Sequence, residues 1–269
     1  MFIEERHQSI LNMLNEKGSI TTGEIQEKFS MSYDSAKRDL RILEEKGLLK
    51  RTHGGAIPLK KIGFGGECHD LSAKERVVAV KENYLEIAKK AVAMIENKDV
   101  IYITGASIGF LMAQNLPAHL CCTVVTCSIS IAEELRRYEN MTVIVTGGEM
   151  ERNGSFYDAF TIEMLNRLRL DKCFITSACI SPKFGISIQK SRNIGVVNAV
   201  INSSKVKIGL YPTEKIGFDS IVSICPANRL DYIITDWDAS KEDLKQFDEQ
   251  GIEVIVVEKE KSMAGDGFM

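Results

Sequence analysis

A run of basic and hydroxyl side chains near the N-terminus has the spacing of a helix with two chemically different sides. At about 100° per residue, the period of an amphipathic helix, residues 32–43 separate into an apolar side and a polar side. The apolar side holds Ala36, Leu40 and Leu43. The polar side holds Asp34, Lys37, Arg38 and Arg41. Such a helix can pack on one side and present cations to the phosphates and base edges of DNA on the other.

Ser32 is placed to cap this helix, and a basic segment follows it. The Ser32 hydroxyl can accept a hydrogen bond from the amide of Ser35 in the first helical turn. Further on, Lys50 and Arg51 lead into Gly54-Gly55, a pair that permits a tight turn and brings backbone amides close to phosphate. For the helix alone, ordinary surface charges on a solvated face are the alternative interpretation. The helix and the basic segment in this order favour a DNA-binding surface.

The elements that must position these residues are three helices and a pair of strands. Residues 3–17 have the apolar periodicity of a first helix. Thr21 and Glu24 have the spacing of a capping box, which predicts the start of a second helix. This helix runs to about Phe29, and the three residues 30–32 form the turn into the third helix. The turn length is that of a helix-turn-helix.

The wing of this module follows the third helix, which Gly47 ends. Residues 48–57 predict two short strands around the glycine pair. Residues 1–60 are nearly neutral, with ten Lys or Arg against nine Asp or Glu. Within this part of the chain the positive charge is local, because residues 46–61 contain five basic residues and no acidic one. The chain as a whole has a net charge of −3, which argues against indiscriminate coating of nucleic acid or membrane. A local positive field is typical of a sequence-specific module.

The composition indicates a globular protein that we expect in the cytoplasm. A length of 269 residues is enough for one small and one ordinary domain. No stretch approaches the roughly 20 apolar residues of a membrane span. The N-terminus opens with Glu4-Glu5-Arg6 instead of the positively charged and then apolar pattern of a signal peptide. The seven cysteines form no C-x-x-C pair, so we expect buried free thiols, with Cys121 and Cys122 in a buried strand, and no metal site.

After residue 74 the pattern changes to short Val- and Ile-rich runs that alternate with helical stretches. The predicted strands are 100–103, 123–126, 142–146, 172–177, 207–211, 232–235 and 253–257. The predicted helices include 82–97, 129–138, 161–169, 196–203 and 241–251. This alternation indicates a mostly parallel sheet with helices on both faces. We predict a DNA-binding domain at 1–57, a glycine-rich linker at 58–74, an α/β effector-sensing and oligomerisation domain at 75–258 and a flexible tail at 259–269.

Small and polar residues follow four of the predicted strands. In a parallel sheet, ligands collect at the carboxyl ends of the strands. Hydroxyls and free amides at helix starts there would suit an anion such as a sugar phosphate, although ordinary turns use the same residues. The four segments are Thr104-Gly105-Ala106-Ser107, Thr126-Cys127-Ser128, Gly147-Gly148 and Thr213-Glu214-Lys215.

The first domain closely resembles the N-terminal signature of the DeoR family of bacterial transcription regulators. Residues 32–40, 43–49 and 51–56 carry the resemblance, which implies double-stranded operator DNA as the partner. It also implies that Ser35, Lys37, Arg38, Arg51 and His53 stand at or beside operator-contacting positions. Lys37 replaces the more usual arginine. This replacement keeps the positive charge but loses the two parallel hydrogen bonds that a guanidinium can donate. The predicted DNA-binding residues are Ser32, Tyr33, Asp34, Ser35, Lys37, Arg38, Arg41, Lys50, Arg51, His53, Gly54 and Gly55.

The order of the strand-end loops resembles the effector domain of the same family, which is similar in fold to ribose-phosphate isomerases. This resemblance extends to about residue 236 and implies a pocket for phosphorylated sugars or related metabolites. The effector-binding positions that match are Ser107, Thr126, Ser128, Gly148, Ser155 and Lys215. The predicted fold class is therefore α/β, a small winged helix-turn-helix followed by a mostly parallel, ribose-phosphate-isomerase-like domain.

Several pocket positions depart from the family pattern. Thr104 stands where the family has an aspartate, and residues 105–108 replace its Ser-Gly-Thr-Thr loop. Residues 176–179 replace Gly-Ala-Asp-Gly. Asn193, Val197 and Pro212 replace a Glu, a Lys and an Asp. The predicted pocket has thus lost most of its carboxylates and one cation. Thr, Ala and Pro cannot accept hydrogen bonds from sugar hydroxyls as a carboxylate does, and they cannot abstract a proton.

Three hypotheses for the second domain remain open. It could sense an altered ligand, less polar or bearing a different anion; it could serve only for oligomerisation; or it could be a sugar-phosphate isomerase, which the lost carboxylates and the DNA-binding module disfavour. We predict no catalytic residue and no cofactor. We expect a sequence-specific transcriptional repressor that binds its operator as a homodimer or higher homo-oligomer, with recognition helices in successive major grooves.

Overall fold

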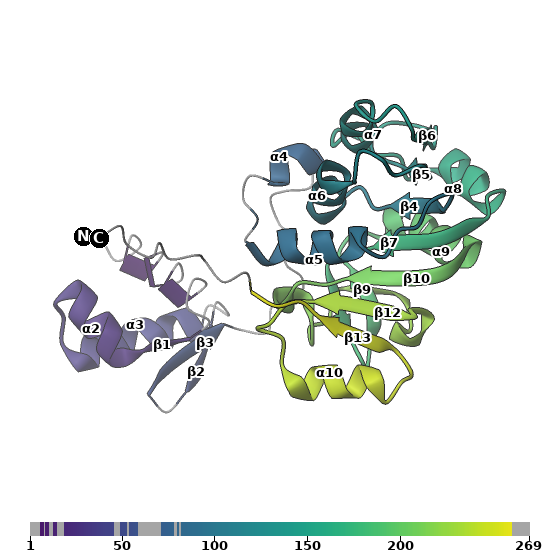
Figure 1. Ribbon diagram of the computed structural model, residues 1–269. Coiled ribbons are helices and arrows are strands. Elements are labelled where there is room, and N and C mark those ends of the chain that lie inside the picture. Colours follow the sequence, from purple (N-terminus) through teal and green to yellow (C-terminus); the bar gives the residue numbers. More distant parts are fainter. Residues whose placement is uncertain are drawn as a thin grey trace, which may run out of the picture. The chain divides into compact units, whose positions relative to one another are not determined.

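The computed structural model describes residues 6–7, 9–10, 13–14, 19–45, 49–52, 54–58, 71–77, 80 and 82–259. The chain divides into two units, Met1–Lys61 and Ile62–Met269 (Figure 1). Within the described residues, no helix is both long and apolar enough to cross a bilayer. The boundaries predicted for the linker and the tail remain predictions, because residues 59–70 and 260–269 lie outside the described part.

The first unit is a winged helix-turn-helix. Its helices are α2 (Thr22–Phe29) and α3 (Tyr33–Glu45). Its strands are β1 (Ile20–Thr21), β2 (Leu49–Thr52) and β3 (Gly55–Pro58), which form an antiparallel sheet in the order β1-β3-β2. The described residues of the predicted first helix are helical, whereas its ends and Gly47 lie outside the described residues. The prediction of the wing is confirmed, and β1 is a third strand that the sequence pattern did not reveal.

Local capping explains where the helices of this unit begin. The Thr21 hydroxyl accepts from the Glu24 amide at 3.1 Å, while the Glu24 carboxylate accepts from the Thr21 amide at 2.8 Å, so the predicted capping box is present. Ser30 ends α2 in the left-handed conformation, with φ 48°. Ser32 accepts from the amide of Ser35 at 3.2 Å, as predicted, and starts α3. The three-residue turn is therefore defined by caps at both ends.

The second unit is built on a seven-stranded sheet in which every pairing is parallel. The strands are β4 (Val100–Ile103), β5 (Thr123–Thr126), β6 (Thr142–Val145), β7 (Leu170–Ile175), β10 (Ser204–Leu210), β12 (Tyr232–Thr235) and β13 (Glu253–Val256). Their order in the sheet is β13-β12-β10-β7-β4-β5-β6. All seven predicted strands are present, and the predicted parallel α/β class is confirmed.

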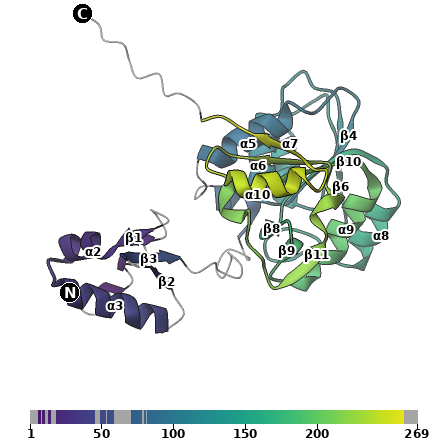
Figure 2. The ribbon, with the colours of Figure 1, turned by 90° about the horizontal axis from the view of Figure 1, so that it is seen from below.

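Helices cover both faces of this sheet (Figures 1 and 2). They are α4 (Ala73–Val77), α5 (Glu82–Val92), α6 (Ser107–Asn115), α7 (Ile129–Leu135), α8 (Ala159–Asn166), α9 (Ile194–Ser203) and α10 (Lys241–Asp248). Helices α5, α6 and α7 enclose one apolar cluster, which includes Ile87, Ile108 and Ile131. Helices α8, α9 and α10 enclose the other, which includes Leu165 and Phe247. The sheet is therefore buried on both sides, as its Val- and Ile-rich strands require.

A small antiparallel sheet was not predicted. It consists of β8 (Cys179–Ser181), β9 (Gly185–Ile188) and β11 (Val222–Cys225), in the order β11-β9-β8. Short 3-10 helices occupy η1 (Ser191–Asn193), η2 (Thr213–Lys215) and η3 (Ala227–Arg229). Figure 2 shows β9 and β11 close to α9, and α9 contacts β11. Strands β8 and β9 of this sheet carry the chain from β7 to η1, and β11 pairs with β9 after the chain has passed through β10.

The structure corrects several predicted boundaries. Helix α5 ends at Val92 and not at residue 97, because the chain turns there and passes through Lys98, with φ 73°, before β4. Strand β7 ends at Ile175, so residues 176–177 lie beyond its carboxyl end. Residues 73–74, predicted as linker, belong to α4.

The cysteine predictions are corrected at one position. Cys121 is exposed and precedes β5, whereas Cys122 is buried, so the pair does not lie within a buried strand. The other described cysteines, Cys127, Cys173, Cys179 and Cys225, are buried free thiols. Cys68 lies outside the described residues.

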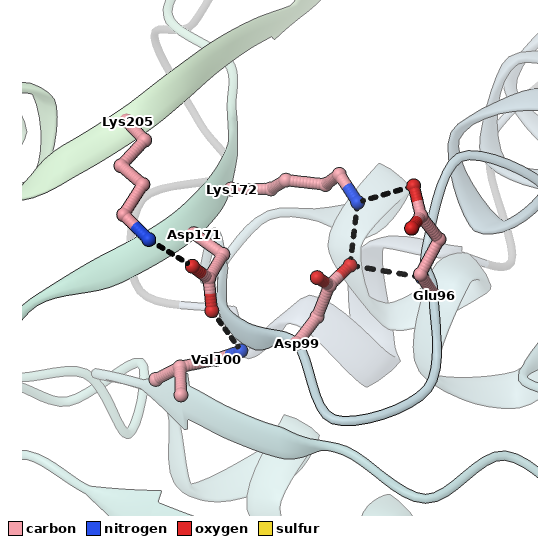
Figure 3. A network of polar contacts seen from close by, with 6 residues as sticks. All are labelled: Glu96, Asp99, Val100, Asp171, Lys172 and Lys205. Atoms are coloured by element: carbon pink, nitrogen blue, oxygen red, sulfur yellow. Dashed lines mark hydrogen bonds and ion pairs between the residues drawn. The ribbon is translucent and has the colours of Figure 1, made fainter.

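Charged groups join the amino ends of three central strands (Figure 3). Lys172 of β7 donates to Asp99, which precedes β4, at 2.6 Å, and to Glu96 at 3.2 Å. Asp171 accepts from the amide of Val100 in β4 at 3.0 Å and from Lys205 of β10 at 2.7 Å. Hydrogen bonds from Lys205 and Val100 keep the pKa of the Asp171 carboxyl below its usual value, despite partial burial. The network sets β4, β7 and β10 in register at the end opposite their carboxyl termini.

We expect Lys172→Met to destabilise the second unit. Only 14% of the Lys172 side chain is exposed, so its removal leaves the carboxylate of Asp99 half-buried without its cation. The expected loss in the free energy of unfolding is about 1–3 kcal/mol. Urea denaturation followed by the fluorescence of Trp237, the single tryptophan, measures it. The control is Lys205→Met, whose side chain is 76% exposed and whose loss should cost less than about 1 kcal/mol. Equal losses for the two variants would contradict this account.

Candidate functional site

The third helix of the first unit presents a polar surface to solvent. The buried side of α3 holds Ala36, Leu40 and Leu43, which pack in the apolar cluster of this unit. The predicted DNA-contacting residues Ser32, Tyr33, Asp34, Ser35, Lys37, Arg38 and Arg41 are all exposed. The Lys37 ammonium lies 5.0 Å from the centre of the Tyr33 ring, which directs these two side chains toward each other. The structure therefore brings the predicted residues of α3 together on one surface.

A buried carboxylate fixes the orientation of this helix. Asp39 points into the unit. Its Oδ2 accepts a hydrogen bond from Arg6 Nε at 2.7 Å, and its Oδ1 accepts one from Arg6 Nη2 at 3.2 Å and lies 3.2 Å from His7 Nε2. Burial raises the pKa of Asp39, but the hydrogen bonds from Arg6 and His7 outweigh it and leave the pKa below its usual value. The N-terminal helical segment is thus tied to α3 through one side chain. A sequence period alone does not distinguish this acid from the exposed ones.

The wing holds its predicted residues in different environments. Arg51 is partly buried, and Glu44 of α3 accepts its backbone amide at 2.9 Å. The backbone of Lys50 pairs in β2, but its side chain and His53 lie outside the described part. Gly54 is exposed in the turn. Gly55 is buried, and a Cβ there would stand 1.9 Å from the Ile20 carbonyl oxygen, so this glycine is required by strand pairing.

The second unit contains a cavity of about 790 Å³ at the carboxyl ends of β4 and β7. Residues 104–108, after β4, and residues 176–178, after β7, line it. The chain runs from β4 to β5 on one side of β4 and returns to β7 on its other side. The cavity therefore lies at the point where the strand order reverses, which is where open α/β sheets bind ligands.

The cavity is lined by cations. Arg76, Lys190, Arg192 and Lys215 contribute to its wall, and its described lining includes no Asp or Glu. Arg192 forms an ion pair with Glu151 at 2.5 Å. Since like charges in one cavity repel each other, an anion bound among them would be stabilised.

Lys215 is held in the wall by two neighbouring side chains. Its ammonium donates to the Thr176 hydroxyl at 3.3 Å and lies 5.9 Å from the centre of the Tyr84 ring. Burial lowers the pKa of Lys215 to about 8; Glu214 opposes this shift, and Arg76 adds to it. A lysine with this pKa is still mostly charged at neutral pH, and a bound anion would favour its charged form.

Neutral polar groups complete the cavity wall. The Oδ1 atom of Asn193, at the start of α9, is buried and accepts no hydrogen bond within the described structure. It could accept one from a ligand hydroxyl, which would remove the cost of leaving a buried acceptor unpaired. Ser177 is already bonded, donating to the Cys179 carbonyl at 2.8 Å and lying 3.1 Å from the Tyr211 hydroxyl. The wall thus combines cations with at least one acceptor.

The structure brings some predicted effector residues into the cavity and places others elsewhere. Ser107 and Lys215 line it. Ser128 and Ser155 form an isolated bridge behind Gly105, where a Cβ would lie 3.1 Å from Ser128 and 3.2 Å from Ser155.

Thr126 and Gly148, like Ser128 and Ser155, do not line the cavity. Thr126 is fully buried and donates to the carbonyl of Ile103 at 3.0 Å. Gly148 borders a separate hollow with Asp158 and Phe160. Contact of all six residues with a ligand remains a prediction.

Several cavity residues were missed from the sequence, Arg76 among them. Arg76 lies on α4, just after the stretch 58–74 predicted as linker, where no helix was predicted. A signal was present, because Ser72 and Glu75 have the spacing of a capping box. In the structure, the Ser72 amide donates to Glu75 at 2.7 Å and the Glu75 amide donates to Ser72 at 3.3 Å. The other missed residues include Tyr84, Tyr102, Asn153, Tyr157, Lys190 and Arg192, for which no local pattern exists.

Family models match both units. Residues 6–61 match the DeoR-like helix-turn-helix domain, and residues 81–237 match the DeoR C terminal sensor domain. The chain belongs to the DeoR family of transcriptional regulators. These matches confirm the predicted family, the predicted DNA-binding domain and the predicted sensor domain.

Similar proteins of this family span nearly the whole chain. The HTH-type transcriptional repressor GlcR of Bacillus subtilis is 30% identical over 97% of this chain and 99% of its own length. The HTH-type transcriptional regulator GolR of Listeria innocua is 27% identical over 96% of this chain and 100% of its own. A lactose phosphotransferase system repressor of Staphylococcus epidermidis is 29% identical over 86% of this chain and 91% of its own.

Among solved structures, ribose 5-phosphate isomerase A of Methanocaldococcus jannaschii is similar to part of the chain. The match has a TM-score of 0.36 and 15% identity, and it covers 49% of this chain and 52% of the isomerase.

We expect Asp39→Ala to destabilise the DNA-binding unit by about 3 kcal/mol, because it leaves Arg6 and His7 without their shared carboxylate. Hydrogen exchange of α3 measures this loss, and the unfolding of the second unit, followed by Trp237, should not change. The lowered pKa of Asp39 means that its contribution is present above about pH 4 and is lost as the pH falls through the folded-state pKa. The variant should therefore lose less protection than the wild type on acidification, and equal acid sensitivity would contradict this role.

We expect Arg38→Ala to weaken binding to the operator more than to random DNA, if Arg38 contacts a base as its exposed position on α3 permits. The loss of discrimination should be about 1–3 kcal/mol. Lys50→Ala should weaken both DNAs similarly and reduce the salt dependence, as expected of a phosphate contact. Fluorescence anisotropy at several salt concentrations measures both, with Arg136→Ala, an exposed arginine of the other unit, as control. Equal losses on both DNAs for Arg38→Ala would rule out base contact.

Proposed function

We propose that this regulator is a repressor whose α/β unit senses a phosphorylated sugar or a related phosphate ester. The observation that carries the proposal is the cavity at the ends of β4 and β7, whose described wall has four cations and no carboxylate. A phosphate group suits such a wall because it has about two negative charges at neutral pH and several acceptor oxygens. Relatives over nearly the full length are named as repressors, one of them of a lactose phosphotransferase system.

The size and the neutral groups of the cavity fit a polyhydroxylated ligand. About 790 Å³ lies within the range of roughly 300–1,000 Å³ that small-molecule sites occupy. Lys215 and Ser107 would bind the phosphate, and the Asn193 Oδ1 would accept from a sugar hydroxyl. Carboxylates that would bind further hydroxyls are missing from the described wall, so we expect fewer hydroxyl contacts than a typical sugar site makes.

We propose sensing in preference to catalysis. Isomerisation of a sugar phosphate requires a group that removes a proton from carbon, usually a carboxylate. The described wall of the cavity includes no Asp or Glu, and the amide of Asn193 cannot accept that proton at neutral pH. A protein that binds operator DNA and a metabolite would act in the cytoplasm.

The proposed mechanism joins two copies through the α/β unit. Each copy would place one recognition helix, α3, in a major groove, so the operator should contain repeated half-sites. A ligand can release the repressor only if it binds the DNA-free arrangement more tightly than the DNA-bound one. The ratio of the two affinities would set the strength of the response.

The proposal predicts that a phosphate ester stabilises the protein and that Lys215 is required. We expect at least one of glucose 6-phosphate, fructose 1-phosphate and ribose 5-phosphate to raise the Tm in a thermal-shift assay. Lys215→Met should weaken its binding by about tenfold or more, as the loss of one charge-assisted hydrogen bond implies. Lys241→Met, an exposed lysine on α10, is the control and should leave binding unchanged.

The pKa of Lys215 adds a pH dependence to this test. The ammonium is charged below its pKa of about 8, so isothermal titration calorimetry should show weaker phosphate binding as the pH rises from 7 to 9. The Lys215→Met variant should lose this dependence. Failure of every phosphate ester to bind, or binding that Lys215→Met does not affect, would contradict the proposed sensor function.

A further inference from the structure

We infer that Arg76 links the occupancy of the cavity to the chain segment that leads to the DNA-binding unit. The inference rests on the proposed function, because it requires an anionic ligand in the cavity. It deepens that function by assigning a positioning residue through which the ligand acts on α4. The evidence is the pair of backbone carbonyls that one guanidinium joins.

Helix α4 is a separately capped turn at the start of the second unit. Ser72 and Glu75 form its capping box, with bonds of 2.7 and 3.3 Å. Ala73 is buried in the same apolar cluster as Ile108 of α6, and α4 contacts α6 and α7. It is the first described element after the segment by which the chain leaves the DNA-binding unit. Helix α4 is therefore the described element nearest in the chain to the DNA-binding unit.

Arg76 bridges this turn and the loop after β4. Its Nη1 donates to the carbonyl of Leu71, two residues before the start of α4, at 2.8 Å. Its Nη2 donates to the carbonyl of Gly105 at 2.9 Å. Both Arg76 and Gly105 line the cavity. One side chain thus holds the start of α4 against the loop on which the ligand would lie.

The charge of Arg76 makes this bridge sensitive to an anion. Arg76 lies close enough to Lys215 to contribute to the lowering of its pKa, so the two cations repel each other across the cavity. A phosphate bound between them would attract both. Hydrogen bonds from a guanidinium to phosphate are stronger than those to neutral carbonyls, so the ligand would compete with Leu71 and Gly105 for the same donors.

The competition should move α4 more than the loop after β4. Gly105 is packed closely, since a Cβ there would lie 3.1 Å from Ser128 and 3.2 Å from Ser155. Helix α4 has five residues, and Ala73 is its only buried residue. A ligand that draws the guanidinium from the Leu71 carbonyl therefore loosens the start of α4 in preference to the loop.

Hydrogen–deuterium exchange on the full-length protein tests this inference. The probes are glucose 6-phosphate, fructose 1-phosphate and ribose 5-phosphate, with binding measured in parallel by calorimetry. In the wild type, a saturating probe should accelerate exchange of the amides of residues 73–77 by about threefold or more. Arg76→Lys keeps the positive charge but cannot donate to two carbonyls from one planar group. This variant should retain the affinity for the probe within about threefold while losing the exchange response. Arg76→Gln should bind more weakly and show fast exchange in this region with or without the probe.

Lys74→Gln is the matched control, because Lys74 is exposed on the same helix and does not line the cavity. It should respond as the wild type does. A probe that binds the wild type without changing exchange at residues 73–77 would overturn the inference and leave the proposed function standing. A response in Arg76→Lys equal to that of the wild type would overturn it as well. If no probe binds, the proposed function is contradicted, and the inference fails with it because it requires a bound anion.

Discussion

The parallel arrangement of seven strands is the constraint on which the second unit depends. Parallel pairing sends every strand's carboxyl end to the same edge, so polar loops far apart in sequence meet there. The charged network around Asp99, Asp171 and Lys172 holds the amino ends of the central strands at the opposite edge. One end of the sheet is thus occupied by paired charges, and the other is open for a cavity. The described wall of the cavity includes no Asp or Glu, whereas Lys172 and Lys205 at the amino ends are paired with carboxylates.

In the DNA-binding unit, α3 uses charged residues for two opposite purposes. Its exposed cations face solvent, where phosphate can neutralise them, whereas Asp39 is buried and satisfied by Arg6 and His7. A buried carboxylate is stabilising only when such partners are present, so it also selects one packing of the N-terminal segment on α3. Gly55 adds a second restriction, since only glycine permits β1 to approach β3. The surface that would contact DNA is therefore oriented by residues that do not face it.

The cavity combines features that suit recognition more than chemistry. Lys215, Arg192 and Arg76 supply charge, and Asn193 supplies an acceptor, but the described wall offers no carboxylate. Sensing requires only that a ligand bind two arrangements with different affinity, and no reacting group has to be placed. Loss of carboxylates at such a site would narrow or shift the range of ligands without removing the response. Arg76 joins the start of α4 to the loop after β4 through the carbonyls of Leu71 and Gly105, so this cavity reaches the first turn of the second unit.

Local patterns in the sequence were sufficient for the seven strands of the main sheet, the parallel class and the helix-turn-helix, but not for β1, α4 or the small antiparallel sheet. Capping pairs such as Thr21 and Glu24, and the Val- and Ile-rich runs, depend on residues a few positions apart, and periodicity reports them directly. Tertiary structure decided which polar residues share a site. It brought Arg76, Asn193 and Lys215 to one cavity and placed Thr126 behind it in a hydrogen bond to Ile103. The physical reason is that burial and charge proximity arise from the order of strands in the sheet, and no short stretch of sequence encodes that order.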